Sequence, residues 1–311
     1  MERVVILKKN FRQGGDGTDK QRFRDLLDEL RLGQMSSDNY KWLLERDERL
    51  LSDEENDKFE KILHLFDTNP RTLEFNLDRL EAHGKPVVDI RAAHDPDDAV
   101  SRRASSKKFD GLHKQVFLAV GAPVMLTMNL WPEGALANST QGTVYDIIYP
   151  AGADPSTSLP DVVLVHVPEY RGPVWLPGHP HVVPIPPRIS ENLISGKYRQ
   201  RRMIPLKLAW AITVHKSQGL TLPDGLTADL SNPEGGQIGR VFVALSRVPE
   251  IHKLRLLNCG AMRWELFADM RRRAGRKGRW KDGWRRRSKA LDRLEELDKR
   301  TANENSHLRY L

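Results

Sequence analysis

An apolar run changes abruptly into a polar cluster between Ala209 and Leu222, where the sequence reads AWAITVHKSQGLTL. The apolar part is typical of a buried segment, yet within a few residues it must place two hydroxyls, an imidazole, an ammonium group and a carboxamide. Groups of these kinds bind phosphate and sugar oxygens. Alone, a short His-Lys-Ser run is more typical of a solvated turn, so the rest of the chain decides between the two interpretations.

Two further segments form a pattern with this stretch. Residues 121–130 read GAPVMLTMNL, and residues 239–248 read GRVFVALSRV. In this order the three segments resemble the late motifs of superfamily 1B DNA helicases, specifically the petite-integration-frequency (PIF) helicases and their RecD-like relatives. Two motifs of that family, Ala-x-Thr-x-His-Lys-Ser-Gln-Gly and Tyr/Phe-Val-Ala-Leu-Ser-Arg, are both present, and the resemblance covers roughly residues 4–260.

The resemblance implies an α/β fold: the second RecA-like domain of a helicase, of the P-loop NTPase type, with a small antiparallel β-barrel of the Src-homology-three kind inserted into it. It divides the chain into a first part of the RecA-like domain (1–135), the inserted barrel (136–190), the remainder of the RecA-like domain (191–262) and a basic tail (263–311). Seven prolines between 150 and 180 agree with the insertion, because they separate short apolar runs and leave no room for a helix.

The composition fits a globular protein with a polyanionic partner. The chain has 311 residues, a formal net charge of +8 and an isoelectric point near 9.5. The single cysteine, Cys259, excludes a disulfide framework and a cysteine-built zinc site, and we expect no metal site. Neither a signal peptide nor a run of about eighteen uncharged apolar residues occurs. We therefore expect an intracellular protein, nuclear or cytoplasmic, without a membrane partner.

The positive charge is concentrated near the end of the chain. Between Arg271 and Lys289 eleven basic residues stand against one acid, Asp282, with Trp280 and Trp284 among them. Two interpretations stay open: a flexible tail that binds nucleic acid or an import receptor, and a solvated extension without a partner.

The first part of the chain is predicted to be scaffold around one functional arginine. A strand at 4–7 leads to Arg12, where the family motif places an arginine on the terminal phosphate of ATP. Without that context Arg12 is an ordinary surface arginine. An amphipathic helix is predicted at 19–32, with Thr18 or Asp19 as its N-cap and Gly33 as its stop.

The remaining elements are predicted from short apolar runs and turn residues. Strands are expected at residues 62–66, 87–92, 121–129, 144–148, 162–167, 181–185, 227–230 and 253–257, and a strand at 203–209 is expected to return to the α/β core. Helices are expected at 36–44, capped by Ser36-Ser37-Asp38, after the acidic segment 52–58, at 70–80 and at 237–248, the last behind a hinge at Gly235 and Gly236. Residues 95–108 have no periodicity and are expected to be a surface loop.

The family motifs, matched one position at a time, imply two sets of site residues. Contacts to single-stranded DNA are implied for Thr68, Asn69, Asn76, Thr127, Asn129, Thr213, His215, Lys216 and Ser217. Contacts to the nucleotide are implied for Arg12, Gln218, Gly219 and Arg247, with Arg12 and Arg247 as catalytic residues and Arg247 as the arginine finger. Helix capping explains Thr68 equally well. Arg240 stands where family members often have glutamine, which weakens a nucleotide role there.

The sequence lacks two parts that this chemistry needs. Neither a Gly-x-x-x-x-Gly-Lys-Ser/Thr phosphate loop nor the carboxylate pair that holds Mg²⁺ occurs. The chain therefore resembles the C-terminal half of a 5′-3′ helicase. We expect ATP and Mg²⁺ to bind only in the complete enzyme, whose N-terminal ATPase half is upstream sequence or a separate chain, and neither to bind this chain alone.

Three interpretations of the chain stay open. It is part of an incomplete or split helicase, a non-catalytic accessory protein that binds single-stranded DNA, or an inert remnant of a mobile-element helicase. Roles in DNA repair, recombination and telomere maintenance are implied by the resemblance alone.

Overall fold

The structure is a computed structural model that describes residues 11–155, 157–229, 238–259 and 264. The predicted strand at 4–7, the hinge at Gly235 and Gly236, the first residue of the helix predicted at 237–248 and the basic tail apart from Trp264 lie outside the described residues. The chain forms two compact units, one of residues 1–60 and 218–311 and one of residues 61–217. No helix in the described ranges has the length and apolar character needed to cross a membrane.

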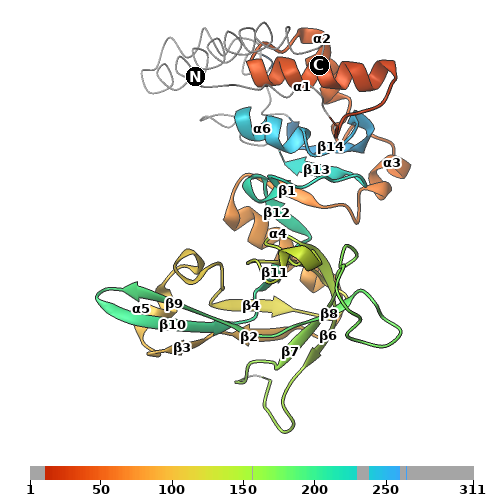
Figure 1. The fold of residues 1–311 in the computed structure, drawn as a ribbon. Coiled ribbons are helices and arrows are strands. Elements are labelled where there is room, and N and C mark those ends of the chain that lie inside the picture. Colours follow the sequence, from red (N-terminus) through yellow and green to blue (C-terminus); the bar gives the residue numbers. More distant parts are fainter. Residues whose placement is uncertain (1–10, 156, 230–237, 260–263, 265–311) are drawn as a thin grey trace, which may run out of the picture. The chain divides into compact units, whose positions relative to one another are not determined.

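The first unit combines helices with a pair of parallel strands (Figure 1). Its elements are α1 (Thr18–Leu32), α2 (Ser37–Leu44), α3 (Asp53–Lys58), β13 (Leu226–Asp229), α6 (Ile238–Leu245), the 3₁₀ helix η4 (Ile251–Lys253) and β14 (Leu254–Leu257). β13 and β14 pair in parallel, with Leu226 opposite Leu254, and α6 lies between them in the sequence. This strand, helix, strand order is the expected α/β arrangement.

α1 covers this arrangement with one apolar stripe. Phe23, Leu26, Leu27 and Leu30 are buried, and the helix contacts α2, α6 and η4. Gly33 ends the helix in the left-handed conformation, as predicted. The predicted N-cap is wrong, because the helix begins one residue earlier: Gly17 is the N-cap and its carbonyl accepts from the Gln21 N–H at 3.0 Å.

Side-chain caps and one arginine fix the other helices of the unit. The Ser36 hydroxyl accepts from the Asn39 N–H at the start of α2, as predicted. The acidic segment does not precede a helix but is itself α3, capped by Ser52. Arg255 on β14 donates to Thr227 Oγ1 at 3.2 Å and to the Asn56 carbonyl at 3.2 Å, which joins α3 to both strands.

The second unit begins with a parallel pair of strands. β1 (His64–Phe66) pairs in parallel with β12 (Ala211–Thr213), and α4 (Asn69–Ala82) contacts both strands. The buried side chains of α4 are Thr72, Asn76 and Leu80. These positions are four residues apart, so they share one face of the helix.

Antiparallel sheets make up the rest of the second unit. Their strands are β2 (Val88–Arg91), β3 (Ala93–Asp95), β4 (Gln115–Leu118), β5 (Pro123–Leu126), β6 (Gln141–Ile148), β7 (Val162–His166), β8 (Val182–Ile185), β9 (Arg188–Ile194), β10 (Lys197–Met203) and β11 (Leu206–Leu208). The sheet orders are β11-β5-β6-β7-β8, β3-β10-β9 and β2-β4. One core of buried residues joins these sheets to Leu80 of α4.

The predicted short strands of the insertion are β6, β7 and β8. Their sheet also contains β5 and β11, which lie outside residues 136–190, and the closed barrel and its bounds stay a prediction. The predicted strand at 203–209 is wrong in its partner. The strand is interrupted at Ile204 and Pro205, and the part after them, β11, pairs antiparallel with β5. The strand that pairs in parallel with β1 is β12.

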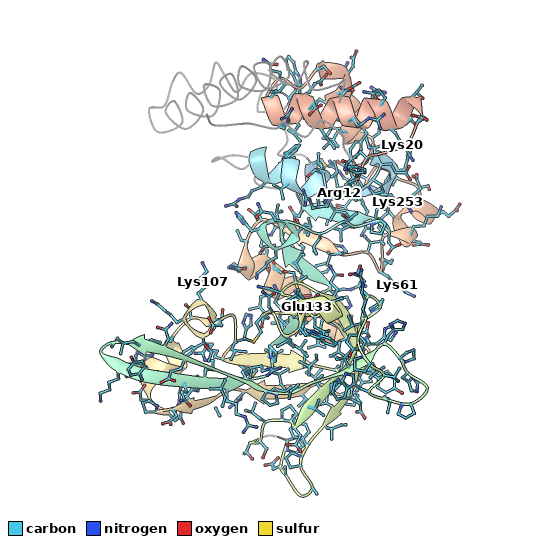
Figure 2. All side chains as sticks on the ribbon, in the orientation of Figure 1. Arg12, Lys20, Lys61, Lys107, Glu133 and Lys253 are labelled. Atoms are coloured by element: carbon cyan, nitrogen blue, oxygen red, sulfur yellow. The ribbon has the colours of Figure 1, made fainter. Side chains whose placement is uncertain are left out.

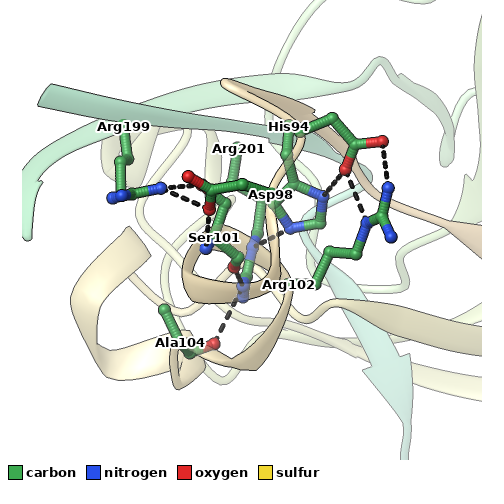
Figure 3. Close-up of polar contacts among 8 residues, drawn as sticks. His94, Asp98, Ser101, Arg102, Ala104, Arg199 and Arg201 are labelled. Carbon is green, nitrogen blue, oxygen red and sulfur yellow. Dashed lines mark hydrogen bonds and ion pairs between the residues drawn. The ribbon is translucent and has the colours of Figure 1, made fainter.

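The expected surface loop at 95–108 is also wrong. It forms α5 (Ala99–Arg103) and the 3₁₀ helix η1 (Ser106–Phe109), beside the long hairpin of β9 and β10 (Figure 1). Asp98 caps α5 at the Ser101 N–H and forms an ion pair with Arg199. A polar network holds this segment in place, which explains why it has no hydrophobic periodicity (Figure 3).

Arg201 is the centre of that network and is fully buried. Its guanidinium donates to the carbonyls of Ser101 and Ala104 at 3.0 and 2.8 Å, and to the Leu112 carbonyl at 3.0 Å. It also donates to His94 Nε2 at 3.1 Å and lies 4.3 Å from the centre of the Phe109 ring. Burial and the charge of Arg201 lower the pKa of His94, which fits a neutral imidazole that accepts this hydrogen bond.

Candidate functional site

The two predicted sets of site residues fall in different units. Arg12, Gln218, Gly219 and Arg247, the nucleotide set, belong to the first unit. The nine residues of the DNA set, from Thr68 to Ser217, all belong to the second. The motif from 213 to 219 is divided between the units after Ser217, so we describe each set by itself.

Arg12 lies against the end of α6 (Figure 2). Its Nη1 donates to the Ser246 carbonyl at 2.9 Å, and its Nε donates to Thr221 Oγ1 at 3.1 Å. The neighbouring Gln13 is buried and donates to the carbonyls of Ser246 and Val248 at 3.2 and 2.7 Å. The segment that carries Arg12 is thus tied to the segment of the predicted arginine finger.

Arg247 is half-buried directly after α6 and bends back onto its own chain. Its Nε donates to the Val243 carbonyl at 2.8 Å and its Nη2 to Ser246 Oγ at 2.8 Å. The Leu222 N–H donates to the Arg247 carbonyl at 3.0 Å, so the segment after Gln218 runs alongside. Burial, and then the charge of Arg12, lower the pKa of Arg247.

This arrangement fits a phosphate group. The structure brings Arg12, Arg247 and the segment from Gln218 to Leu222 together, with Gln218 and Gly219 exposed. Gly219 has a φ of 89°, a conformation that favours glycine. Because each guanidinium disfavours the charge of the other, an anion between them would stabilise both. Among the described residues no group of three or more His, Cys, Asp or Glu could hold a metal ion.

Three predicted DNA contacts are buried and hold the structure together. Asn76 donates to the Ala211 carbonyl at 2.9 Å and accepts from the Ala211 N–H at 3.0 Å, which fixes α4 to β12. Thr213 is 8% exposed, in the pairing of β12 with β1. Ser217 is fully buried, and its hydroxyl donates to the Val214 carbonyl at 2.7 Å. Because their side chains are buried, we leave these three residues out of the candidate DNA-binding surface.

The bond from Ser217 closes the 3₁₀ helix η3 (Val214–Ser217) and turns the two basic residues between its ends outward. His215 is exposed, and Lys216 Nζ donates to Asn138 Oδ1 at 3.5 Å. The Asn138 N–H in turn donates to Asn129 Oδ1 at 2.8 Å. Three exposed or part-exposed residues from three segments, Lys216, Asn138 and Asn129, therefore lie close together. With His215, the neighbour of Lys216 in the chain, we call them the polar surface.

The other predicted contacts lie in two settings. Thr68 and Asn69 are exposed at the start of α4, and the Thr68 side chain makes no capping hydrogen bond. Their N-terminal position suits an anion. Thr127 precedes Asn129 of the polar surface by two residues in the sequence, and it is buried. Its hydroxyl has no hydrogen-bond partner among the described residues.

An aromatic patch beside Asn129 was missed in the sequence. Trp131 and Trp175 are 41% and 59% exposed, and both contact the buried Tyr170. A Cβ on Gly172 would lie 2.5 Å from the Trp131 ring, so the close approach requires glycine. Exposed aromatic rings stack on nucleic-acid bases. The sequence feature that could have indicated this patch is Trp131, two residues after Asn129. It is not part of the family motifs, so it was not chosen as a site residue.

Cys259 is not part of either site. It is buried, and burial, followed by the charge of Asp47, raises the pKa of its thiol to about 12. A thiol with so high a pKa is not a nucleophile at neutral pH.

Comparisons with known proteins agree with the motif-based resemblance. No family model matches the chain. The ATP-dependent DNA helicase PIF1 of Danio rerio is 34% identical over 143 residues, which is 45% of this chain and 19% of that protein. The ATP-dependent DNA helicase Pif1 of Psychrobacter sp. is 50% identical over 64 residues, which is 21% of this chain and 9% of that protein. The matches span about a fifth or less of these two relatives.

Solved structures agree over more of the chain. The Pif1 helicase from Candida albicans has a TM-score of 0.65 and 25% identity, covering 88% of this chain and 60% of that one. Bacteroides Pif1 bound to ssDNA has a TM-score of 0.57 and 21% identity, covering 85% of this chain and 54% of that one, and it supports the fold alone. The chain is a relative of the PIF helicases: it resembles them in sequence over about half of its length and in fold over most of its length.

Proposed function

We propose that the chain is the C-terminal portion of an ATP-dependent 5′-3′ DNA helicase. It binds single-stranded DNA through the second unit, and its first unit supplies the arginine finger to ATP held by a Walker-type domain, which is the N-terminal ATPase half. The observation that carries this proposal is the polar surface: a short helix presents His215 and Lys216 outward, and Lys216 reaches Asn138 beside Asn129.

The polar surface suits the backbone of a single strand. Lys216 supplies charge, while the imidazole and the amides supply hydrogen-bond donors for phosphate oxygens. Contacts of this kind position a strand without reading its bases. The exposed Trp131 and Trp175 lie in the same unit and offer ring faces to any base. We therefore expect binding that tolerates sequence, weakens with salt and prefers single strands to duplex.

The double variant His215→Ala with Lys216→Ala tests the surface. It should lower the affinity for single-stranded DNA by about 1–3 kcal/mol, because charge-assisted hydrogen bonds to phosphate are lost. The measurement is fluorescence anisotropy of a labelled oligonucleotide, in a chain without residues 271–311 so that the basic tail cannot mask the loss.

The chain offers a matched control. His252 and Lys253 are also a His-Lys pair on a 3₁₀ helix, η4, but they belong to the first unit. His252→Ala with Lys253→Ala removes the same charge and should leave the affinity close to that of the parent. Equal affinities for the parent and the folded His215/Lys216 variant would show that the motif is structural here.

ATP in the complete enzyme would be contacted by Arg12 and Arg247, whose guanidinium groups lie against one end of α6. Their chemistry is the binding of phosphate oxygens. The phosphate loop and the Mg²⁺ carboxylates are absent from this sequence, and no arginine replaces them.

The chain alone should therefore hydrolyse no ATP above background. The measurement is phosphate release with and without single-stranded DNA. Hydrolysis that is stimulated by single-stranded DNA and abolished by Arg247→Ala would contradict this expectation.

A second candidate is a non-catalytic accessory protein that binds single-stranded DNA. One observation favours it: every residue of the polar surface lies within residues 61–217, a unit that contains none of the predicted nucleotide residues. Addition of a PIF-type ATPase domain separates the two candidates, since only a helicase half gains DNA-stimulated hydrolysis that depends on Arg247.

A further inference from the structure

Lys207 is a half-buried lysine on β11 to which no motif assigns a role. In the antiparallel pairing of β11 with β5, Lys207 lies opposite Met125 and Leu206 lies opposite Leu126. Successive side chains of a strand point to opposite faces of a sheet. Because Leu206 and Leu208 belong to the core of the unit, Lys207 points to the other face.

The same face carries Thr127, one of the predicted DNA contacts. The Thr127 N–H donates to the Pro205 carbonyl at 2.9 Å, which continues the pairing of the two strands by one step. Thr127 is therefore a diagonal neighbour of Lys207, within reach of a long side chain. Its hydroxyl has no partner in the part of the chain that the structure describes.

Two further basic groups lie near Lys207. Burial, and then the charge of Lys216, lower the pKa of Lys207 to about 8. Burial, and then the charges of Lys207, Arg201 and Lys216, lower the pKa of His113 to about 4. β4 and β5, which contact β11, have no ionisable side chain. Within the described ranges, no carboxylate forms an ion pair with Lys207 or Lys216.

Like charges gathered without a counter-charge disfavour one another. An anion would stabilise them, and Lys216 already reaches Asn138 on the polar surface. We propose that Lys207, together with Lys216, holds a backbone phosphate of single-stranded DNA. This inference rests on the proposed function and adds to it a phosphate site that extends from the polar surface along the face of β11.

Such a site makes DNA binding depend on pH. An ammonium group that gains an anionic partner has a higher pKa in the complex than in the free protein. The contribution of Lys207 is therefore complete below its free pKa of about 8 and is lost as the pH rises above that value. His113, whose pKa is about 4, does not titrate in this range.

The test is the affinity for a fluorescein-labelled oligothymidylate, measured by anisotropy at about pH 7 and about pH 9. It is measured for the full chain and for the chain without residues 271–311, in which the basic tail cannot mask a loss. Lys207→Met should lower the affinity about tenfold at the lower pH, through loss of a charge-assisted hydrogen bond, and should weaken the pH dependence. Lys207→Arg stays charged at both pH values. It should therefore bind like the wild type at the lower pH and keep that affinity at the higher pH. Lys216→Gln should bind more weakly. It should also shift the loss of affinity to higher pH, because the charge of Lys216 no longer lowers the pKa of Lys207.

The outcomes separate this inference from the proposed function. If the wild-type chain binds and folded Lys207→Met binds equally well at both pH values, the inference is wrong and the proposed function stands. A fall in affinity that persists unchanged in Lys207→Arg also overturns the inference, because another group then titrates. If the wild-type chain does not bind, both fail. Lys207→Arg keeps the test decisive if Lys207→Met does not fold.

Discussion

Replacing Arg247 with alanine in a complete enzyme, made by joining this chain to a PIF-type ATPase domain, should lower kcat for ATP hydrolysis by about 10³-fold. The guanidinium of an arginine finger stabilises the charge that develops on the transferred phosphoryl group. Because this interaction is strongest in the transition state, the KM for ATP should change far less than kcat. The measurement is steady-state hydrolysis with saturating single-stranded DNA.

The geometry of the first unit supports this role for Arg247. The side chain follows α6 directly, and its bonds to Val243 and Ser246 hold the guanidinium close to Arg12. Its Nη1 also donates to the Leu220 carbonyl at 3.4 Å, a long hydrogen bond that a phosphate oxygen would replace. Arg247→Lys keeps a charge but not the planar fork of donors, and it should recover only a small part of the lost rate.

Arg240 provides the matched control for the finger. It is an arginine on α6 itself, half-buried, at the position where the family resemblance to a nucleotide contact is weakest. Arg240→Ala should change kcat by less than about threefold, because no transition-state contact is lost. An intact kcat in Arg247→Ala, together with weaker DNA binding, would mean that Arg247 serves the DNA and not the phosphoryl group.

Local sequence signals predicted the end of α1 and the start of α2 in the first unit, although they misplaced the N-cap of α1 and the position of α3. Gly33 ends α1 and Ser36 caps α2 as expected, because caps depend on a few neighbouring residues. The strands β6, β7 and β8 also lie where short apolar runs stand between prolines. The sequence did not predict which strands pair. The partner of β11 is β5, some eighty residues away in the chain, and no local pattern encodes that choice.

The motif residues show a second limit. The family resemblance grouped Asn76, Thr213 and Ser217 with the exposed DNA contacts, because a motif records which residues occur together and not what each one does. In the structure Asn76 fixes α4 to β12, and Ser217 closes η3, the short helix that carries the partly exposed Lys216. Only burial and hydrogen-bond partners separate a positioning residue from a contacting one.

The misread segment at 95–108 gives the physical reason for a third limit. Hydrophobic periodicity identifies elements that apolar packing holds in place. α5 is held mainly by polar bonds to Arg199 and Arg201 on β10, about a hundred residues further along the chain. In η1, the Lys108 carbonyl accepts from Asn192 Nδ2 on β9 at 2.9 Å. A segment of this kind looks like a solvated loop in the sequence, although Ser101 and Phe109 are fully buried.

Arg201→Met should lower the free energy of unfolding of the second unit by about 3 kcal/mol or more. Methionine fills a similar volume but donates no hydrogen bond, so the carbonyls of Ser101, Ala104 and Leu112 lose their partner together. A buried polar group left unsatisfied costs about 1–3 kcal/mol. Part of the loss is offset, because the buried charge of the arginine is itself costly, as its lowered pKa indicates.

Arg102 is the control within the same network. It is an exposed arginine of α5 whose Nη2 lies 2.7 Å from Asp97 Oδ2, at the rim of the cluster around His94 (Figure 3). Arg102→Met removes one ion pair that water can replace, so it should destabilise the unit far less than Arg201→Met. Both variants lose one positive charge, and the difference between them isolates burial and hydrogen bonding.

Because the chain has two units, global unfolding need not be a single transition, and a local measurement is the sharper one. Amide hydrogen exchange of residues 99–109 reports the opening of α5 and η1 directly. Arg201→Met should speed exchange there much more than in β13 or β14, which belong to the other unit. If Arg102→Met and Arg201→Met accelerate exchange equally, the buried guanidinium does not hold the segment, and packing around Phe109 becomes the better explanation of its fold.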